Sequence, residues 1–430
     1  MVPVALCTAV LVTACGEATS QAPDPQAPRP DRIIDWSLRA LVSALPDRTL
    51  AGQLIIAGVE SDGDGRPLAK LDEPMRRVIA DVQPGGMVLF GGSFRDVDQT
   101  LALLGELHDA SSVPPIIATD HEGGLVARLT STGGVPATRV PPASVVGRAV
   151  RALDDEGLVV AEELGRLMGR ELRALGVTMN FAPVADVDPS DRVGAIGRHG
   201  RTFGDDPVLV GRIAAAVIRG LQEARVAAVV KHFPGHGGLT SDSHDGYAAL
   251  LTSADELRDR ELLAFALAFE AEPLGVMTAH VSIPRATGND LPATISPEVT
   301  RMAREDLGYN GLIVTDALNM RGLAEIAPEP ELVVRAVEAG ADVLLKPLDP
   351  VGARDALLEA LAGGRIDRGT LEQSTLRVFS VKEKLGILGP QWAIDAGSAA
   401  GDLHFARETL GAAEHVLLVE QIIELAGGTD

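Results

Sequence analysis

Cysteine is almost absent from this 430-residue chain. Its only two cysteines, Cys7 and Cys15, fall within the first fifteen residues, so the rest of the chain has neither a disulfide nor a thiol for chemistry. A zinc site built from cysteines and a cysteine nucleophile are therefore excluded beyond this leader.

Aromatic and basic residues are also scarce. Aromatic side chains make up 3% of the sequence although hydrophobic residues make up 46%, so the core must consist mainly of aliphatic side chains. Such a composition suits parallel strands that are buried on both faces. The 38 basic residues are outnumbered by 60 acidic ones, for a net charge of -22. Because a surface of this sign repels the phosphates of nucleic acids, we expect no nucleic-acid partner.

The first fifteen residues, MVPVALCTAVLVTAC, form an almost unbroken apolar run. A run of this length is typical of a signal-peptide core and is too short to span a bilayer as a mature helix. Its end, Leu11 to Cys15, resembles a bacterial lipobox, in which the cysteine receives the lipid. Residues 1–15 are therefore predicted to be a lipoprotein signal peptide, with Cys15 as the lipidation site.

The segment that follows, residues 16–31, is rich in Pro, Ala and Gln and is predicted to be a disordered tether. Leader and tether together predict an extracytoplasmic protein that is either lipid-anchored to the bacterial cell membrane or secreted. The lipid on Cys15 is the only contact with the membrane that we expect.

Short aliphatic runs alternate with longer amphipathic stretches through most of the chain. One such stretch, residues 162–176, has leucines at the i, i+3, i+4 spacing of a helix and a glycine at its end. The pattern predicts an α/β fold with a single (β/α)8 TIM-type barrel over residues 32–388, followed by a short C-terminal extension, residues 389–430. An open doubly wound sheet is the alternative, but no glycine-rich phosphate fingerprint follows the first run. The eight runs are Leu54–Val59, Gly85–Gly91, Pro114–Asp120, Val177–Asp186, Val226–Phe233, Leu274–His280, Gly311–Ala317 and Ala341–Pro347.

Polar residues close six of these runs. Because the carboxyl ends of the strands meet at one face of such a barrel, where active sites lie, these residues predict a common pocket. The residues are Asp120, Asp186, Lys231 with His232, His280, Asp316 and Lys346.

Two of these strand-end residues allow more than one chemistry. Asp316 could be a nucleophile toward an electrophilic carbon, a metal ligand or a general base. Lys231 could form a Schiff base, or it could bind hydroxyls or anions. Neighbouring carboxylates would keep this lysine charged, which favours binding.

Histidines gather between Lys231 and His244, in KHFPGHGGLTSDSH. His232 and His236 are four residues apart, but the Pro-Gly pair between them prevents the helix that would bring both to one metal ion. Neither a metal nor another cofactor is expected. Asp242 lies two residues before His244, where its carboxylate can fix the tautomer of the ring and leave the other nitrogen to exchange a proton.

Several longer motifs occur together and in a characteristic order. On them the chain resembles glycoside hydrolase family 3 and, within it, the β-N-acetylglucosaminidases of bacterial cell-wall recycling, the NagZ type. The resemblance spans about residues 54–386. The motifs are DHEGG (Asp120–Gly124) with Arg128, NFAPVADV (Asn180–Val187), GRTFGDDP (Gly200–Pro207), KHFPGHG with the DSH that follows, MTAH (Met277–His280) and GLIVTDALNM (Gly311–Met320).

The resemblance implies a role for each matching residue. Asp316 matches the nucleophile that attacks the anomeric carbon, His244 the acid/base and Asp242 its partner. The residues that match those binding the hydroxyls of the terminal sugar are Asp120, Arg128, Arg201, Lys231 and His232. The loop before Arg201 is longer than usual in the family, so Arg198 is an alternative to Arg201.

The resemblance therefore implies a retaining exo-β-N-acetylglucosaminidase that acts on peptidoglycan fragments through a covalent glycosyl-aspartate intermediate. A β-glucosidase or a glycoside phosphorylase of the same family is one alternative, and a sugar-binding lipoprotein without catalysis is another. Because an imidazole in place of a second carboxylate would not repel phosphate, phosphate could replace water as the acceptor.

Overall fold

The computed structural model of the chain describes residues 38–61, 65–130, 134–188, 194, 196–239, 248–388 and 402–428. The predicted signal peptide with Cys15 and the tether at residues 16–31 lie outside these ranges. So do Asp242 and His244, the predicted acid/base pair.

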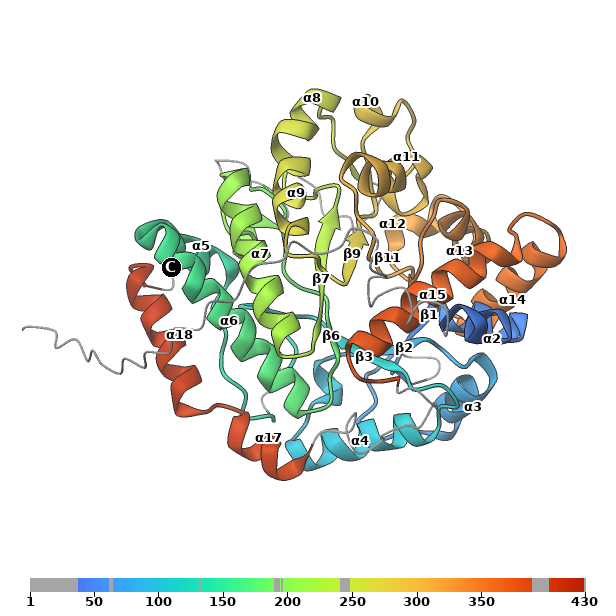
Figure 1. Cartoon of the computed structure of the whole chain (residues 1–430), viewed down its shortest axis with the longest axis horizontal. Coiled ribbons are helices and arrows are strands. Elements are labelled where there is room, and N and C mark those ends of the chain that lie inside the picture. Colours follow the sequence, from blue (N-terminus) through green and yellow to red (C-terminus); the bar gives the residue numbers. More distant parts are fainter. Residues whose placement is uncertain are drawn as a thin grey trace, which may run out of the picture.

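Eight parallel strands form the centre of the protein (Figure 1). Their order in the sheet is β11-β9-β7-β6-β3-β2-β1-β12, and an isolated parallel bridge between Val314 and Val343 links the two outermost strands, so the sheet is a nearly closed barrel. Each strand lies within one of the eight predicted runs, which confirms the predicted (β/α)8 fold. The strands are β1 (Ile55–Gly58), β2 (Gly86–Leu89), β3 (Ile116–Thr119), β6 (Met179–Asn180), β7 (Ala227–Phe233), β9 (Gly275–Thr278), β11 (Leu312–Thr315) and β12 (Leu344–Leu345).

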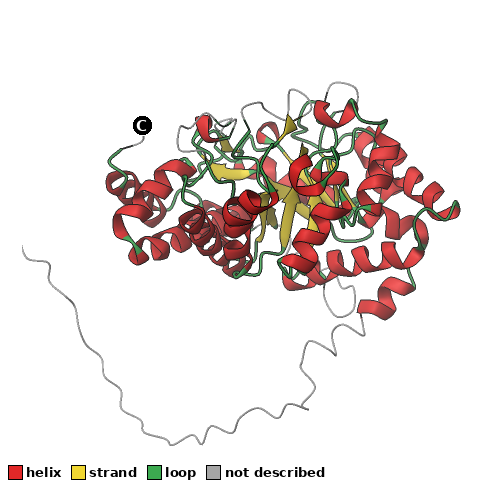
Figure 2. Cartoon of the chain, turned by 90° about the horizontal axis from the view of Figure 1, so that it is seen from above, coloured by secondary structure: helices red, strands yellow, loops and turns green. Residues whose placement is uncertain are grey.

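Helices surround this sheet, which is visible at the centre in the view from above (Figure 2). The helix predicted at residues 162–176 begins earlier, at Asp155, and Gly176 follows its end in a left-handed conformation, with φ 88. The longer helices are α2 (Asp47–Gln53), α3 (Glu73–Val82), α4 (Val97–Asp109), α5 (Ala143–Leu153), α6 (Asp155–Ala174), α7 (Pro207–Glu223), α9 (Leu263–Phe269), α13 (Glu329–Glu338), α14 (Pro350–Ala362) and α15 (Arg368–Lys384).

An Asp-Pro pair fixes where two of these helices begin. The carboxylates of Asp206 and Asp349 accept a hydrogen bond from a backbone N–H in the first turn of α7 and α14, respectively. Pro207 and Pro350 follow at the position where a helix needs no N–H. The helices therefore start at fixed points after the loops that carry the polar strand-end residues.

Shorter elements fill the connections. A hairpin of β4 (His121–Gly123) and β5 (Val126–Ala127) follows β3, and β8 (Ala248–Ala249) pairs with β10 (Val281–Ser282). The short helices are η1 (Gly91–Ser93), η2 (Gly197–His199), α8 (Ala254–Leu257), η3 (Arg258–Leu262), α10 (Pro284–Thr287), η4 (Ala293–Ile295), α11 (Pro297–Arg301), η5 (Met302–Asp306) and α12 (Arg321–Ala324).

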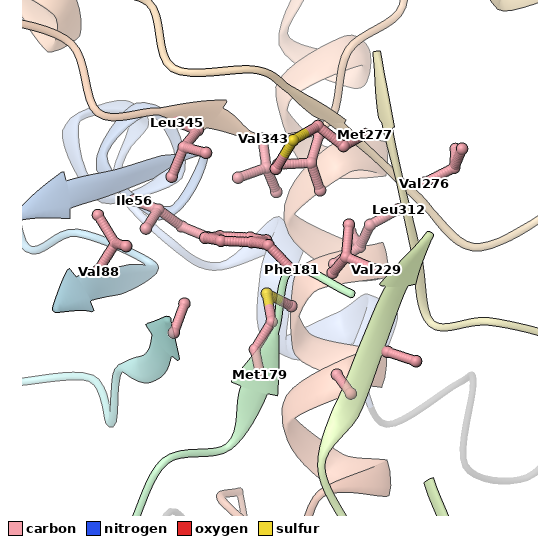
Figure 3. Close-up of a cluster of buried hydrophobic side chains, with 14 of the residues drawn as sticks. Ile56, Val88, Met179, Phe181, Val229, Val276, Met277, Leu312, Val343 and Leu345 are labelled. Carbon is pink, nitrogen blue, oxygen red and sulfur yellow. The ribbon is translucent and has the colours of Figure 1, made fainter. Parts of the chain in front are cut away.

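The barrel interior is a layer of aliphatic and sulfur-containing side chains, as the composition predicts. The ring of Phe181 lies in the middle of this cluster (Figure 3) and is fully buried. The other labelled side chains of the cluster come from seven of the eight strands and the residue before β12: Ile56, Val88, Met179, Val229, Val276, Met277, Leu312, Val343 and Leu345.

The C-terminal extension ends in two helices, α17 (Leu403–Thr409) and α18 (Ala413–Leu425). They pack on the outside of the barrel, α17 against α4 and α6, and α18 against α5 and α6 (Figure 1). Within the described ranges, no helix combines the length and the apolar character that crossing a membrane requires.

One buried carboxylate, that of Glu171 on α6, joins this extension to the barrel. It accepts hydrogen bonds from the N–H and the hydroxyl of Thr138, at 2.9 and 2.6 Å. It also accepts bonds from the Gly411 N–H at 2.9 Å and from His415 Nδ1 at 3.0 Å. Burial alone would raise the pKa of Glu171, but these donors together hold it below its ordinary value.

We expect Glu171→Gln to lower the free energy of unfolding at pH 7 by about 2 kcal/mol, because an amide cannot accept all four bonds. A carboxylate whose pKa is lowered by folding stabilises the protein above its unfolded pKa, and this contribution is lost as the pH falls through the folded value. The difference between variant and wild type should therefore shrink below pH 4.5, the ordinary value for glutamate. Urea unfolding of variant and wild type at several pH values measures this difference in unfolding free energy.

Glu163→Gln is the matched control, since Glu163 is exposed on the same helix and pairs only with Arg166 there. Exposed ion pairs of this kind contribute about 1 kcal/mol or less to the free energy of unfolding. If the two substitutions lowered the free energy of unfolding equally at pH 7, the inference that Glu171 holds the C-terminal extension to the barrel would be contradicted.

Candidate active site

A cavity of about 440 Å³ opens at the carboxyl ends of the strands. Its volume is within the range of about 300 to 1,000 Å³ that is usual for small-molecule sites. Val88, Met277 and Leu345, three side chains of the barrel core, form part of its lining. The described residues that the sequence assigns to nucleophile and sugar binding all line this cavity: Asp120, Arg128, Arg201, Lys231, His232 and Asp316.

Lys231 and His232 are consecutive on β7 yet both line the cavity. Side chains in a regular strand alternate between the two faces. Here the pairing of β7 with β9 shifts register between Val230 and Phe233, where three steps on β7 oppose two on β9, from Val276 to Thr278. This extra residue is a bulge, which lets two neighbouring side chains reach the same space.

The ammonium of Lys231 lies between two carboxylates. Its Nζ is 2.6 Å from Asp120 Oδ1 and 2.7 Å from Glu122 Oε1. Glu122 also accepts two hydrogen bonds of 2.8 Å from the guanidinium of Arg201, through Nε and Nη2. The buried Lys231, the partly buried Arg201 and the two carboxylates thus form a neutral cluster on one side of the cavity, which we call the inner charge cluster (Asp120, Glu122, Arg201 and Lys231).

Burial and ion pairing shift the pKa values of these groups in opposite directions. Burial alone would raise the pKa of Glu122, but Lys231 and Arg201 lower it to about 2. Burial alone would lower the pKa of Lys231, but Asp120 and Glu122 raise it above its ordinary value. A lysine that keeps its proton cannot attack a carbonyl carbon, so the cluster favours binding of hydroxyls over Schiff-base chemistry.

Glu122 is a site residue that the sequence reasoning missed. It belongs to the DHEGG motif, but nothing in a single sequence shows that the glutamate, rather than the aspartate alone, faces the cavity. On β4 the neighbouring His121 is fully buried, and burial lowers its pKa to about 4. Gly123 follows at φ 100, where a Cβ atom would lie 2.4 Å from the Pro141 carbonyl oxygen, so only glycine lets the chain turn here.

His232 is held by Asp186, which is fully buried and does not line the cavity. The ring nitrogen Nδ1 of His232 is 2.7 Å from Asp186 Oδ2. The other oxygen of Asp186 accepts hydrogen bonds from the backbone N–H groups of His232 and His236, at 3.3 and 2.8 Å. The prediction that Asp186 lines the pocket is therefore wrong, because its carboxylate orients His232 from behind.

His280, the other strand-end residue that does not line the cavity, is held in the same way. Its Nδ1 is 2.7 Å from the hydroxyl of Thr294, and its Nε2 is 2.9 Å from the carbonyl oxygen of Ala317, to which it donates. Its contact with the residue after Asp316 fixes the turn that carries the predicted nucleophile.

Asp316 follows β11 and lines the same cavity as the inner charge cluster. Its Oδ1 accepts a 2.7 Å hydrogen bond from the N–H of Ala317. Burial alone would raise the pKa of Asp316, but the imidazoles of His280 and His232 and the ammonium of Lys231 lower it below its ordinary value. This partly buried carboxylate is therefore ionised at neutral pH, as a nucleophile must be.

Two further cations, Arg128 and Lys346, line the cavity. The guanidinium of Arg128 lies 5.8 Å from the centre of the Phe90 ring, and within the described residues its buried Nε has no hydrogen-bond partner. Lys346, after β12, also lines the cavity. Arg198, the alternative to Arg201, is exposed on η2 and is not part of the lining, so the structure places Arg201 and not Arg198 at the site.

The described ranges contain no group of three or more His, Cys, Asp or Glu side chains arranged to hold a metal ion. His232 and His236 have ring centres 5.6 Å apart, and burial followed by the influence of His232 lowers the pKa of His236 to about 4.

Comparison with known proteins identifies close relatives. The model of the glycosyl hydrolase family 3 N terminal domain matches residues 48–381. A β-hexosaminidase of Hydrogenovibrio crunogenus is 35% identical over 281 residues, which cover 65% of this chain and 76% of that protein.

Two solved structures have the same fold. A glycoside hydrolase family 3 β-N-acetylglucosaminidase from a Paenibacillus species superposes with a TM-score of 0.76 at 34% identity, over 89% of this chain and 69% of that chain. A β-glucoside phosphorylase, BglX, superposes with a TM-score of 0.77 at 26% identity, over 93% of this chain and 67% of that chain.

We expect Glu122→Ala to lower the free energy of unfolding by about 3 kcal/mol at pH 7, because it leaves two buried cations with one carboxylate between them. Since folding lowers the pKa of Glu122 from 4.5 to about 2, its stabilising effect is complete above pH 4.5 and is lost as the pH falls toward 2. Denaturant unfolding across this range is the measurement.

Glu338→Ala removes a half-exposed partner of Arg365 and serves as the comparison. This substitution should lower the free energy of unfolding by about 1 kcal/mol or less. A Glu122 variant as stable as this control would show that the inner charge cluster is dispensable.

Proposed function

The chain belongs to glycosyl hydrolase family 3 and is a glycoside hydrolase, and we propose that it is a retaining exo-β-N-acetylglucosaminidase. The observation that carries the proposal is that an ionised Asp316 and a neutral cluster of hydrogen-bonding groups line one cavity. The relative named a β-hexosaminidase and the neighbour named a β-N-acetylglucosaminidase support the choice of sugar.

In the proposed reaction, an oxygen of Asp316 attacks the anomeric carbon while the bond to the leaving oxygen breaks. The leaving oxygen takes a proton from His244, and a glycosyl ester of Asp316 forms. His244 then takes a proton from water, whose oxygen attacks the same carbon and releases Asp316. Two inversions give net retention, as in glycosidases that use two carboxyl groups. Asp242 would orient the ring of His244 and stabilise its charged form.

The terminal sugar would be bound through its hydroxyls by the five residues that the sequence assigns to this role: Asp120, Arg128, Arg201, Lys231 and His232. Charged donors and acceptors suit this task, because hydrogen bonds to ionised groups are stronger than those between neutral groups. Glu122 positions Lys231 and Arg201, and Asp186 positions His232.

The natural substrates we propose are muropeptides or other N-acetylglucosamine-containing fragments of the cell wall. The lipobox-like end of the leader supports this choice, since a protein anchored outside the cytoplasm through Cys15 works next to the wall. Residues 1–15 would be the signal peptide, 16–31 the tether, 32–388 the catalytic barrel and 389–430 its extension.

A glycoside phosphorylase is the second candidate, and the similarity to a β-glucoside phosphorylase favours considering it. With phosphate as the acceptor in the second step, the product would be a glycosyl phosphate instead of a free sugar. Product analysis with and without phosphate decides between the two: free N-acetylglucosamine in both cases supports the hydrolase.

We expect Asp316→Ala to abolish turnover of aryl β-N-acetylglucosaminides, because no other described group replaces the nucleophile. His244→Ala should retain activity on a dinitrophenyl glycoside, whose leaving group needs no proton, and lose at least about a hundredfold on a poor leaving group. Steady-state kinetics on the two substrates measure this, with the matching β-glucosides as the test of sugar preference.

The control is His232→Ala, which removes the imidazole of the described His232–Asp186 pair. If His232 rather than His244 were the acid/base, the dependence on leaving group would appear in this variant instead. Full activity of Asp316→Ala, or faster turnover of the glucoside than of the N-acetylglucosaminide by wild type, would contradict the proposed function. Sugar binding without any turnover by wild type would indicate a binding protein.

A further inference from the structure

One helix with an irregular turn lies beside the chain that leaves β7. The elements α8, η3 and α9 follow one another without a break from Ala254 to Phe269, and α9 packs against α7 next to β7 (Figure 1). The middle element, η3 (Arg258–Leu262), is a π-helix turn. Single π-helix turns within α-helices are rare and are frequently found at functional sites. The side chains of this turn are therefore candidates for a role beyond the helix itself.

Two neighbouring side chains of this turn form an ion pair, which we call the π-turn pair (Arg260 and Glu261). Oε1 of Glu261 accepts a 2.9 Å hydrogen bond from Nε of Arg260 and a second bond from its Nη2. The side chain of Glu261 is fully buried, whereas that of Arg260 is 39% exposed. Within the described residues, Oε2 of Glu261 has no hydrogen-bond partner. Burial raises the pKa of Glu261, although Arg260 opposes this shift.

The stability of the fold alone does not explain this carboxylate. A buried acceptor without a donor costs free energy, because its bonds to water are lost and not replaced. Replacing a buried ion pair by apolar side chains of similar volume is often neutral or stabilising. An apolar residue in place of Glu261 would therefore serve the helix at least as well, and the contacts of the pair point to a different role.

Both side chains of the π-turn pair lie against the chain just after β7. A Cβ atom at Gly235 would lie 2.3 Å from Cγ of Glu261, and one at Gly238 would lie 2.8 Å from Nη2 of Arg260. The backbone of Gly235, with φ 139, is also in a region that other residues rarely adopt. The two glycines therefore let the π-turn pair approach the backbone of this segment directly.

The beginning of this segment is also held from the barrel side. Asp186 lies 2.7 Å from the ring nitrogen Nδ1 of His232 and accepts a hydrogen bond from the N–H of His236 at 2.8 Å. His232 therefore keeps its place in the cavity without the π-turn pair. The pair acts on the part nearer Gly238, from which the chain continues toward the proposed acid/base.

We propose that the π-turn pair positions the segment Gly235–Gly238 and, through it, the proposed acid/base His244 on the loop that follows. The proposal rests on the proposed function. It makes Glu261 and Arg260 positioning residues, since neither lines the cavity that holds Asp316. Glu261 packs on Gly235 and holds the guanidinium of Arg260 beside Gly238, so the loss of either side chain removes a support of the segment.

Proton transfer is the step that such a change affects most. The acid has to lie within hydrogen-bond reach of the leaving oxygen, and a misplacement of about 1 Å can lower a rate by about a hundredfold. Attack by Asp316 does not depend on this segment, because Asp316 follows β11 and His280 holds the turn after it. A substrate whose leaving group needs no proton therefore serves as an internal reference.

The test compares two leaving groups in variants of the π-turn pair. We expect Arg260→Ala and Glu261→Ala to lower kcat/KM for N,N′-diacetylchitobiose, whose leaving sugar needs a proton, by about tenfold or more. kcat/KM for the dinitrophenyl N-acetylglucosaminide should change by less than about twofold. Arg260→Ala is the safer variant for folding, because this arginine is partly exposed and alanine favours helices.

Arg258→Ala is the matched control, since Arg258 lies on the same turn but is 65% exposed and pairs with Asp255. It should leave kcat/KM for both substrates unchanged. Glu171→Gln controls for a general loss of stability, because it alters a buried carboxylate elsewhere in the barrel. It should lower the free energy of unfolding without changing the ratio of the two kcat/KM values.

Unchanged disaccharide kinetics in both variants of the π-turn pair, with folding verified by circular dichroism, would overturn the proposal. An equal loss on both substrates would overturn it too, because the pair would then support the site as a whole and not the proton transfer. Neither result touches the proposed function, which is tested by turnover of the dinitrophenyl glycoside by wild type and by the leaving-group dependence of His244→Ala.

Discussion

The placement of the substrate depends on one buried contact, that of the Lys231 ammonium with the carboxylates of Asp120 and Glu122. Together with Arg201 it joins four segments that are far apart in the sequence: the end of β3, the hairpin strand β4, the bulge of β7 and the loop after η2. Because the charges balance, these polar groups can be buried beside an aliphatic core without an uncompensated ion. The same balance keeps Lys231 protonated and Glu122 ionised, so the site presents fixed donors and acceptors.

The ionisation of Asp316 depends on a different balance. Partial burial alone would favour its neutral form, but the imidazoles of His280 and His232 and the ammonium of Lys231 keep its pKa below the ordinary value. His280 and Asp186 contribute without lining the cavity, since one holds the turn after Asp316 and the other holds His232. The site is thus a polar ring supported by a second set of hydrogen bonds, on a rigid parallel barrel.

Much of this arrangement could be predicted from the sequence. The eight aliphatic runs identify the strands because parallel strands are buried on both faces, and the polar residues that close six of these runs mark the barrel face. What a side chain does there could not be read in this way: Asp186 and Asp316 both lie at the end of a predicted run, yet only Asp316 lines the cavity. Glu122 was missed because it lies in a short hairpin outside the main strands.

The central claim is that Asp316 attacks the anomeric carbon from within this ring. The most direct measurement is peptide mass spectrometry of the enzyme after reaction with 5-fluoro-N-acetylglucosaminyl fluoride, a substrate that forms the ester quickly and releases it slowly. We expect one added fluorosugar, located on the peptide that contains Asp316 and absent when Asp316→Asn enzyme is treated. A label on another residue, or turnover of the reagent without any covalent adduct, would contradict the account.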